Sequence, residues 1–287
     1  MKIKGWWCPT EGIEVPLDHY ESGACADEPM PAEWIMAIYD QNAGDTTHAD
    51  LQITATRMMA CPRKVAIEDG IPTAPDPMAL NAMFQGTVRH YYMQHKTRAG
   101  SYKEVVFPPE GAPPVPFLGT VIERATVDNA TADLACIKDY KTGSEASHNF
   151  TFSRGCPKEE QAQASIYKIV MERSMPGVSV EKAIIWHNAQ VSGRSKAPAW
   201  YKFVIPRDVP WLSEEQIGEM RPKDSEFTVR EHIAQLLAHK ARIGAGESVR
   251  ESIKKMPLVG RKMMGGKGCQ YCAVARTCNV LEGIVNV

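Results

Sequence analysis

The sequence predicts an α+β (α/β) fold in which a sheet of short strands is flanked by helices. Several segments rich in β-branched residues are short and are separated by proline, glycine and asparagine, which is typical of strands joined by turns. Other segments repeat their apolar residues every three to four positions, as amphipathic helices do. The chain has 287 residues, of which 44% are hydrophobic and 23% are charged. This is the composition of a soluble globular protein and argues against disorder of the whole chain.

The predicted elements follow one another along the chain. Apolar spacing predicts a helix over residues 54–68, interrupted near Cys61 and Pro62, and a longer helix over residues 77–95 with proline in its first turn. Three short strands come next and are expected to form a meander, because only turn residues separate them. The predicted elements after these helices are strands 104–107, 119–127 and 134–141, a helix over 158–173, strands 182–188 and 200–205, and a mostly helical segment over 213–243 that is interrupted near Pro222.

Charge is distributed unevenly along the chain, although the formal net charge is only -1. Between Gly5 and Thr56 there is no lysine or arginine, but there are ten acidic residues. We therefore predict an acidic extension over residues 1–50 that packs on a main domain over residues 51–287. Residues 250–267 hold six basic residues and one acidic residue, which indicates either a surface that faces a polyanion or a solvated basic loop.

The sequence gives no sign of a membrane segment. No apolar run approaches the roughly 20 residues that span a bilayer, and the first residues lack the apolar segment of a signal peptide. The chain is therefore expected to stay in the cytoplasm. It also contains no Walker motif, so any helicase activity would have to come from a partner.

The cysteines point to a metal centre. A cytoplasmic chain is not expected to hold a disulfide framework, and eight cysteines are more than core packing needs. Three of them, Cys269, Cys272 and Cys278, form a C-x2-C-x5-C pattern near the end of the sequence. Three thiolates so close together can converge on one soft metal ion or cluster, with a fourth ligand from elsewhere. Cys61, which precedes a proline, is the candidate for that ligand. The competing residues are Cys8, Cys25, Cys136 and Cys156.

Candidate catalytic residues concentrate on the predicted strand 134–141. Side chains alternate across a strand, so Asp139 and Lys141 share one face and Tyr140 points to the other. An Asp-x-Lys pair alone is a weak signal, because any solvent-facing strand can carry one. Its context strengthens it, since other polar groups lie in neighbouring predicted elements. They are His90 on the helix before the strands, Glu123 on the preceding strand, and Gln163 and Tyr167, which share one face of the following helix.

These motifs together resemble the RecB-like branch of the PD-(D/E)XK nuclease superfamily, in particular the CRISPR-associated iron-sulfur exonucleases and the nuclease domain of AddB. The motifs that carry the resemblance occur in the family's order over most of residues 51–278. They are T-A-T-R-M-M-A-C-P from Thr54, G-T-V-R-H from Gly86, G-x3-E-R from Gly119, D-Y-K-T-G from Asp139, Q-x3-Y from Gln163, and the terminal C-x2-C-x5-C.

The resemblance implies a fold, a site and a cofactor. The fold would be a restriction-endonuclease-like core with a mixed central sheet flanked by helices. The active site would consist of His90, Glu123, Asp139 and Lys141, supported by Gln163 and Tyr167. A 4Fe-4S cluster on Cys61, Cys269, Cys272 and Cys278 would join an N-terminal helix to the C-terminus. The family usually has aspartate three residues after the strand glycine, whereas Glu123 lies four after Gly119, so Asp128 is the alternative second acid.

The residue types predict metal-assisted hydrolysis of a phosphodiester bond. Glu123, Asp139 and the backbone carbonyl of Tyr140 are oxygen donors suited to magnesium or manganese, and a neutral His90 could add a ligand that favours manganese. Lys141 would orient the attacking water or offset charge that develops in the transition state. Tetrahedral zinc is the alternative to iron and sulfur at the four cysteines.

The function expected from this reading is a metal-dependent exodeoxyribonuclease that acts on single-stranded DNA or frayed ends. Its pathway would be recombination, repair or CRISPR spacer acquisition, with a helicase or a CRISPR integrase complex as a possible partner. The alternative is a non-catalytic DNA-binding or adaptor subunit of such a complex. The complete set of histidine, acids and lysine favours the enzyme, because an adaptor would be expected to have lost at least one of them.

Overall fold

The computed structural model describes residues 4–8, 12–19, 35, 37–38, 52–73, 85–88, 101–222, 225–257, 272 and 274–281. The chain divides into two compact units. Unit 1 comprises residues 1–52, 60–84 and 221–287, and unit 2 comprises residues 53–59 and 85–220. Of the predicted acidic extension over residues 1–50, the structure describes residues 4–8, 12–19, 35 and 37–38, so its boundary stays a prediction.

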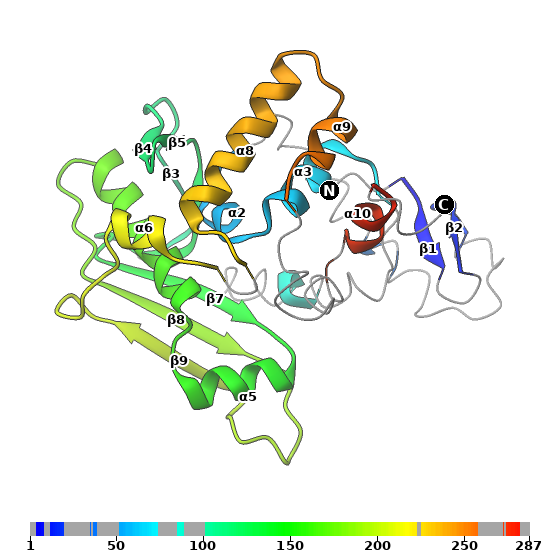
Figure 1. The fold of residues 1–287 in the computed structure, drawn as a ribbon. Coiled ribbons are helices and arrows are strands. Elements are labelled where there is room, and N and C mark those ends of the chain that lie inside the picture. Colours follow the sequence, from blue (N-terminus) through cyan, green and yellow to red (C-terminus); the bar gives the residue numbers. More distant parts are fainter. Residues whose placement is uncertain are drawn as a thin grey trace. The chain divides into compact units, whose positions relative to one another are not determined.

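Unit 2 is built on a mixed five-stranded sheet in the order β3-β6-β7-β8-β9 (Figure 1). Neighbouring strands are antiparallel except for β7 and β8, which are parallel. The strands are β3 (Ser101–Phe107), β6 (Ala125–Thr131), β7 (Cys136–Thr142), β8 (Lys182–Asn188) and β9 (Trp200–Ile205), and a separate hairpin is formed by β4 (Val115–Phe117) and β5 (Thr120–Ile122).

The predicted mixed sheet flanked by helices is confirmed. The three predicted strands do form consecutive antiparallel neighbours, but the one predicted over 119–127 is divided. Its first part pairs with β4, whereas its second part is β6 and pairs with β3 and β7. The division falls at residues 123–124, which are exposed and belong to neither strand.

A short turn sets the register between β6 and β7. Asp133 accepts hydrogen bonds from the Thr131 hydroxyl at 2.6 Å and from the Ala135 backbone N–H at 3.0 Å. The Thr131 hydroxyl bond, followed by the backbone bond, holds the pKa of the Asp133 carboxyl below its usual range. Leu134 takes a positive φ of 59° in this turn. The turn leads to the pairing of Asn129 with Lys138, and continuing that antiparallel register sets residue 128 opposite residue 139.

Helices connect and cover the strands of unit 2. The predicted helix over 158–173 is α6 (Lys158–Ser174), which links the parallel strands β7 and β8 and buries Ile166, Val170 and Met171. The sequence reading missed α5 (Glu145–Arg154), which begins at the cap residue Ser144. Serine followed by glutamate, and a glycine at the end, are signals that could have found it. The other helices of this unit are α2 (Ala55–Met59) and α7 (Glu214–Glu219).

Unit 1 has its own hydrophobic core, formed mainly by helices that are distant in sequence. The core unites α3 (Pro62–Gly70), α8 (Val229–Gly244), α9 (Val249–Lys254) and α10 (Ala275–Leu281). Its buried residues include Val65, Ile67, Leu236, Ile253 and Val274. A small sheet of β1 (Trp6–Cys8) and β2 (Ile13–Val15) completes the described elements of this unit.

Two predicted interruptions are present in the structure. The helical segment 54–68 divides at Cys61, after which Pro62 begins α3. The segment 213–243 divides into α7 and α8 around Pro222. Proline lacks the backbone N–H that continues a helix, which explains both divisions. Among the helices that the structure describes, none has both the length and the apolar character needed to cross a membrane.

Candidate functional site

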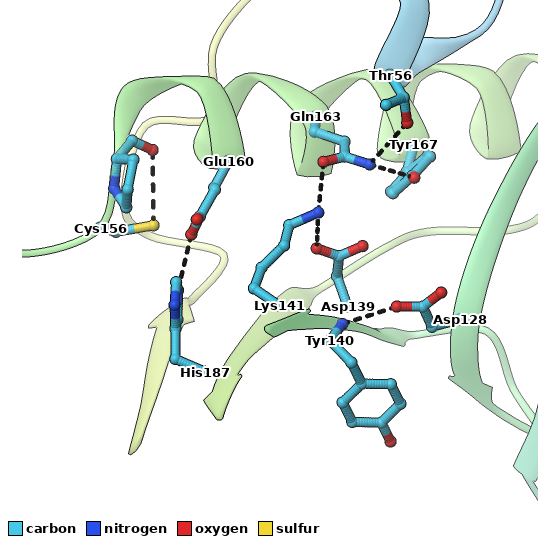
Figure 2. A network of polar contacts seen from close by, with 11 residues as sticks. Thr56, Asp128, Asp139, Tyr140, Lys141, Cys156, Glu160, Gln163, Tyr167 and His187 are labelled. Carbon is cyan, nitrogen blue, oxygen red and sulfur yellow. Dashed lines mark hydrogen bonds and ion pairs between the residues drawn. The ribbon is translucent and has the colours of Figure 1, made fainter. Parts of the chain in front are cut away.

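Asp139 and Lys141 lie on the face of β7 that is turned toward α6, as the alternation of the strand predicts. The Lys141 ammonium lies 2.6 Å from a carboxylate oxygen of Asp139 (Figure 2). Asp139 is buried and Lys141 is partly buried. Both charges are therefore largely withdrawn from water, and each needs compensation from the other and from nearby polar groups.

Two α6 side chains complete the environment of the lysine. Lys141 Nζ donates to Gln163 Oε1 at 2.7 Å, and Gln163 Nε2 donates to the Tyr167 hydroxyl at 2.6 Å (Figure 2). Gln163 also reaches Thr56 Oγ1 on α2, at 3.4 Å. The structure thus joins the predicted residues Lys141, Gln163 and Tyr167 in one chain of hydrogen bonds.

A second carboxylate comes from β6. Asp128 Oδ2 accepts a hydrogen bond of 2.7 Å from the backbone N–H of Tyr140, and Figure 2 shows the side chain beside Asp139. Two acids on adjacent strands thus flank the buried end of the site. The negative charge of Asp128 acts on Asp139 directly, as the pKa of Asp139 shows.

The pKa of Asp139 is raised above its usual range. Burial is the main cause, and it outweighs the opposing effect of Lys141, while Asp128 and Glu160 raise the value further. For Lys141, burial alone would lower the pKa, but the attraction of Asp139 and then of Glu160 and Asp128 reverses the direction, and the pKa is raised. The lysine therefore stays a cation, whereas the charge of Asp139 remains under-compensated. Such a group favours the binding of an additional cation.

The structure places Glu123 outside this group, contrary to the expectation that it faces Asp139. Glu123 is exposed in the connection between β5 and β6. The expectation treated residues 119–127 as one strand, and the division of that strand changes which acid faces β7. The alternative acid, Asp128, takes the position that had been assigned to Glu123.

Sequence reasoning missed a second polar pair beside the site. Glu160, in the first turn of α6, lies 2.8 Å from Nε2 of His187 on β8 (Figure 2). His187 is the register partner of Lys141 across the parallel strands, and Tyr201 stacks on its ring at 4.9 Å between centroids. Only the helical spacing of Glu160, three residues before Gln163, could have suggested that it shares the face that carries the site.

His90 lies outside the described residues, so its predicted role stays a prediction. Residues 85–88, just before it, are helical. A Cβ atom added to Gly86 would lie 2.6 Å from the Thr142 hydroxyl oxygen. The absence of a side chain at Gly86 thus allows this helical segment to approach the end of β7 closely.

The described oxygen donors that could hold a divalent cation are the carboxylates of Asp128 and Asp139 and the carbonyl of Tyr140. Within the described ranges, no group of three or more histidine, cysteine, aspartate or glutamate side chains has the arrangement of a metal site. Two carboxylates on adjacent strands, one of them buried, nevertheless match the hard oxygen donors that magnesium and manganese prefer.

Three of the four predicted cluster cysteines are described, and all three belong to unit 1. Cys61 is the cap residue before α3, and Cys272 and Cys278 are partly buried against the core that α3 helps to form. Cys269 lies outside the described residues, as does the competitor Cys25. The predicted 4Fe-4S cluster therefore stays a prediction.

The other competing cysteines have different surroundings. Cys136 and Cys156 belong to unit 2, whereas Cys8 is buried in β1. Burial, followed by the charge of Glu160, raises the pKa of the Cys156 thiol to about 12. Burial also raises the pKa of Cys136. Both residues lie in unit 2, whereas the described cluster candidates Cys61, Cys272 and Cys278 lie in unit 1.

Comparison with known families gives one match. A model of the PD-(D/E)XK nuclease superfamily matches residues 124–279, more than half of the chain. The matched region begins one residue after Glu123 and includes Asp128, Asp139, Lys141 and Gln163. A comparison with curated proteins found no match.

Similar solved structures have low sequence identity. The crystal structure of SSO0001 is 13% identical, with 78% of this chain and 96% of that chain covered and a TM-score of 0.46. The alkaline exonuclease LHK-Exo from Laribacter hongkongensis is 13% identical, with 75% and 96% covered and a TM-score of 0.39. LHK-Exo in complex with dAMP is 16% identical, with 69% and 94% covered and a TM-score of 0.37.

The hydrogen-bond chain on α6 makes a testable contribution to stability. We expect Gln163→Leu to lower the free energy of unfolding by about 1–3 kcal/mol, because it removes the acceptor of a partly buried ammonium and the donor to a buried hydroxyl. The measurement is urea denaturation followed by circular dichroism. Gln190→Leu, in an exposed connection, is the matched control and should change the value by less than about 0.5 kcal/mol. Equal effects of the two substitutions would contradict the role given to Gln163.

Proposed function

The chain belongs to the PD-(D/E)XK nuclease superfamily, and on this premise we propose that it is a metal-dependent exodeoxyribonuclease that acts on single-stranded DNA or frayed ends. The observation that carries the proposal is the group of Asp128, Asp139 and Lys141 on two adjacent antiparallel strands, with the lysine held by Gln163. An acid pair next to a lysine combines a cation-binding site with a donor for phosphate oxygens.

Asp128 and Asp139, with the carbonyl of Tyr140, would hold magnesium or manganese, and we propose His90 as an additional ligand. When bound, the cation would polarise the scissile phosphate and lower the pKa of a bound water. The raised pKa of Asp139 supports this assignment, because a second positive charge would stabilise its ionised form. We propose Asp128 in place of Glu123 on the basis of the strand register.

Lys141 would act as an ammonium throughout the reaction. Its raised pKa keeps it protonated at neutral pH, so it would donate hydrogen bonds to the attacking water or to a non-bridging phosphate oxygen rather than accept a proton. Gln163 would position Lys141 by accepting a hydrogen bond from its ammonium. Tyr167 would orient Gln163 by accepting a hydrogen bond from its amide group. Neither side chain needs to touch the reacting atoms.

For the cysteines we propose a 4Fe-4S cluster with Cys61, Cys269, Cys272 and Cys278 as ligands. Two observations support this proposal. α10, which carries Cys278, packs against α3, the helix that begins after Cys61. The position of Cys61 at the start of α3 also favours its thiolate, since the amino end of a helix has a partial positive charge. The cluster would be structural, because it would close a loop of more than 200 residues that includes residues 85–220 of unit 2.

The exonuclease type, the pathway and a partner of the helicase or integrase class are proposed from the sequence resemblance. The first test is incubation of anaerobically purified protein with end-labelled single-stranded and duplex DNA, in magnesium, manganese or EDTA. Release of nucleotides from an end, dependent on the metal ion, is expected. Binding without cleavage under every condition would favour the adaptor subunit instead.

Substitution of the β7 pair should remove catalysis without unfolding the protein. Asp139→Asn and Lys141→Gln should each lower the rate of DNA cleavage at least about a hundredfold, because each removes a charge that acts on the reacting phosphate. Both side chains keep their approximate size, so the far-ultraviolet circular dichroism spectrum should not change. Lys158→Gln, at an exposed position of α6, is the control. Cleavage at the wild-type rate by either variant would show that the site is wrongly assigned.

The two candidate second acids should differ strongly. Asp128→Asn is expected to lower the rate of metal-dependent cleavage strongly and to raise the magnesium concentration needed for half-maximal residual activity, because its carboxylate lies beside Asp139. Glu123→Gln should leave both quantities within about twofold of wild type, since the side chain is exposed outside the site. A magnesium titration of the initial rate measures both. The reverse ranking would show that the register of β6 does not define the metal site.

The cluster proposal has a spectroscopic test. Anaerobically purified protein should be brown, with a broad absorption near ~400 nm and about four iron atoms per chain. Cys61→Ser or Cys272→Ser should bleach it and increase protease sensitivity, because metal binding is coupled to folding. Cys8→Ser and Cys136→Ser are the controls and should keep the colour. About one equivalent of zinc in a colourless protein would replace the iron assignment, and full iron content in Cys61→Ser would exclude Cys61 as a ligand.

A further inference from the structure

The sheet of unit 2 has a second face, which points away from α6. On β7, Tyr140 lies between Asp139 and Lys141 and points to this opposite side, as Figure 2 shows. The alternation of side chains extends the same face across β8 and β9. We call this set the outer face. Its members are Lys138 and Tyr140 on β7, Ile184 and Trp186 on β8, and Trp200, Lys202 and Val204 on β9.

The strand register fixes the positions of these side chains relative to one another. Tyr140, Trp186 and Lys202 form one row across the three strands, and Lys138, Ile184 and Val204 form the next. Within the first row, the Lys202 ammonium lies 5.2 Å from the centre of the Trp186 ring. Trp200 lies two residues from Lys202 on the same face of β9. Aromatic rings and ammonium groups are therefore immediate neighbours.

The outer face is open to solvent on β9, whereas Trp186 on β8 is half-buried and Asn129, the register partner of Lys138 on β6, is buried. Trp200 is 45% exposed and Val204 is 47% exposed, and Lys202 is exposed as well. On the same two strands, the inward-pointing residues Ile185, His187 and Tyr201 are each less than 9% exposed. A fully covered sheet would bury its tryptophans in the same way, so the described structure leaves this large aromatic surface in contact with water.

The charge of the outer face has one sign. Its seven positions include two lysines, Lys138 and Lys202, and no acid. Lys182, the first residue of β8, points to the same side by the alternation of the strand, and its charge acts on Asp133 in the turn before β7. Tyr140 lies between Asp139 and Lys141 on β7, so the outer face is the reverse side of the strand that carries the candidate active site.

We propose that the outer face is an auxiliary binding site for single-stranded nucleic acid, a site that would feed the active site of the proposed nuclease and that rests on that function. Unpaired bases would stack on Trp200 and Trp186, and Lys138 and Lys202 would contact the phosphates. Flat aromatic side chains on an open sheet, beside cationic groups, are the features by which proteins hold single strands without reading their sequence. Paired bases are stacked within a duplex and cannot reach such rings, so the surface selects single strands.

The proposal gives the active site a specificity that its own residues do not supply. Asp139 and Lys141 recognise a phosphate, which single strands and duplexes share. Tyr140 is adjacent to both residues on β7, so a strand that crosses the outer face approaches the catalytic strand from the opposite side. Selection of single strands would thus be a property of the sheet surface rather than of the metal site.

The test is equilibrium binding in EDTA, where cleavage cannot occur. Fluorescence anisotropy of labelled oligothymidylate of 20 nucleotides gives the dissociation constant, with oligouridylate and a 20-base-pair duplex as further arms. Trp200→Ala should weaken single-strand binding about tenfold through lost stacking. Lys202→Gln should lower the slope of log affinity against log salt by about 0.7, the value for one released phosphate contact on a single strand.

Two control variants match the substitutions in type and exposure. Phe150→Ala removes an aromatic ring that is 55% exposed on α5, and Lys240→Gln removes an exposed charge on α8. Both should bind the oligonucleotide as the wild type does. Duplex binding should be unchanged in Trp200→Ala, and comparison of oligouridylate with oligodeoxyuridylate, which carries the same base, identifies the preferred sugar.

Several results would overturn the proposal. Binding of Trp200→Ala and Lys202→Gln within twofold of wild type would exclude the outer face, as would an equal loss on the duplex. A wild-type dimer that becomes a monomer in Trp200→Ala, measured by light scattering, would assign this face to a second copy of the chain. Because binding is measured without metal, a wild-type protein that binds single strands but never cleaves them would refute the nuclease activity and keep the binding site.

Discussion

The partly buried ion pair between Asp139 and Lys141 is the constraint on which the candidate site depends. Removing two opposite charges from water costs free energy that their attraction alone often does not recover, so further hydrogen bonds are required. Gln163 provides one of them to the lysine, and Tyr167 and Thr56 in turn hold Gln163. These hydrogen bonds require the face of α6 that carries Gln163 to be turned toward the sheet. They also require Thr56 of α2 to lie within reach of Gln163.

The same pair links the connectivity of the sheet to its chemistry. α6 joins the parallel strands β7 and β8, and this crossover lets one helix face contact both strands at once. Gln163 then meets Lys141 on β7, while Glu160, one turn earlier, meets His187 on β8. His187 and Lys141 are register partners, so the two contacts lie side by side. A hairpin connection would leave no helix to supply these polar groups.

The candidate active site and the proposed cluster site belong to different units. The short segment from Thr54 to Pro62 contributes to both, because α2 belongs to unit 2 and α3 to unit 1. Thr56 thus takes part in the hydrogen bonds of the candidate active site, whereas Cys61 caps α3, which belongs to the core that Cys272 and Cys278 pack against. Each unit has its own core. The proposed catalytic residues belong to unit 2, and the proposed cluster ligands belong to unit 1.

Local periodicity determined much of the site from the sequence alone. The two-residue repeat of a strand set Asp139 and Lys141 on one face, and the four-residue spacing on a helix set Gln163 beside Tyr167, because both patterns depend only on backbone geometry. The second acid could not be found in this way. Whether Glu123 or Asp128 faces Asp139 depends on where one strand is divided and on the register that the turn around Asp133 produces. The contact of Glu160 with His187 joins residues 27 positions apart, and only the tertiary packing of α6 on the sheet brings such residues together.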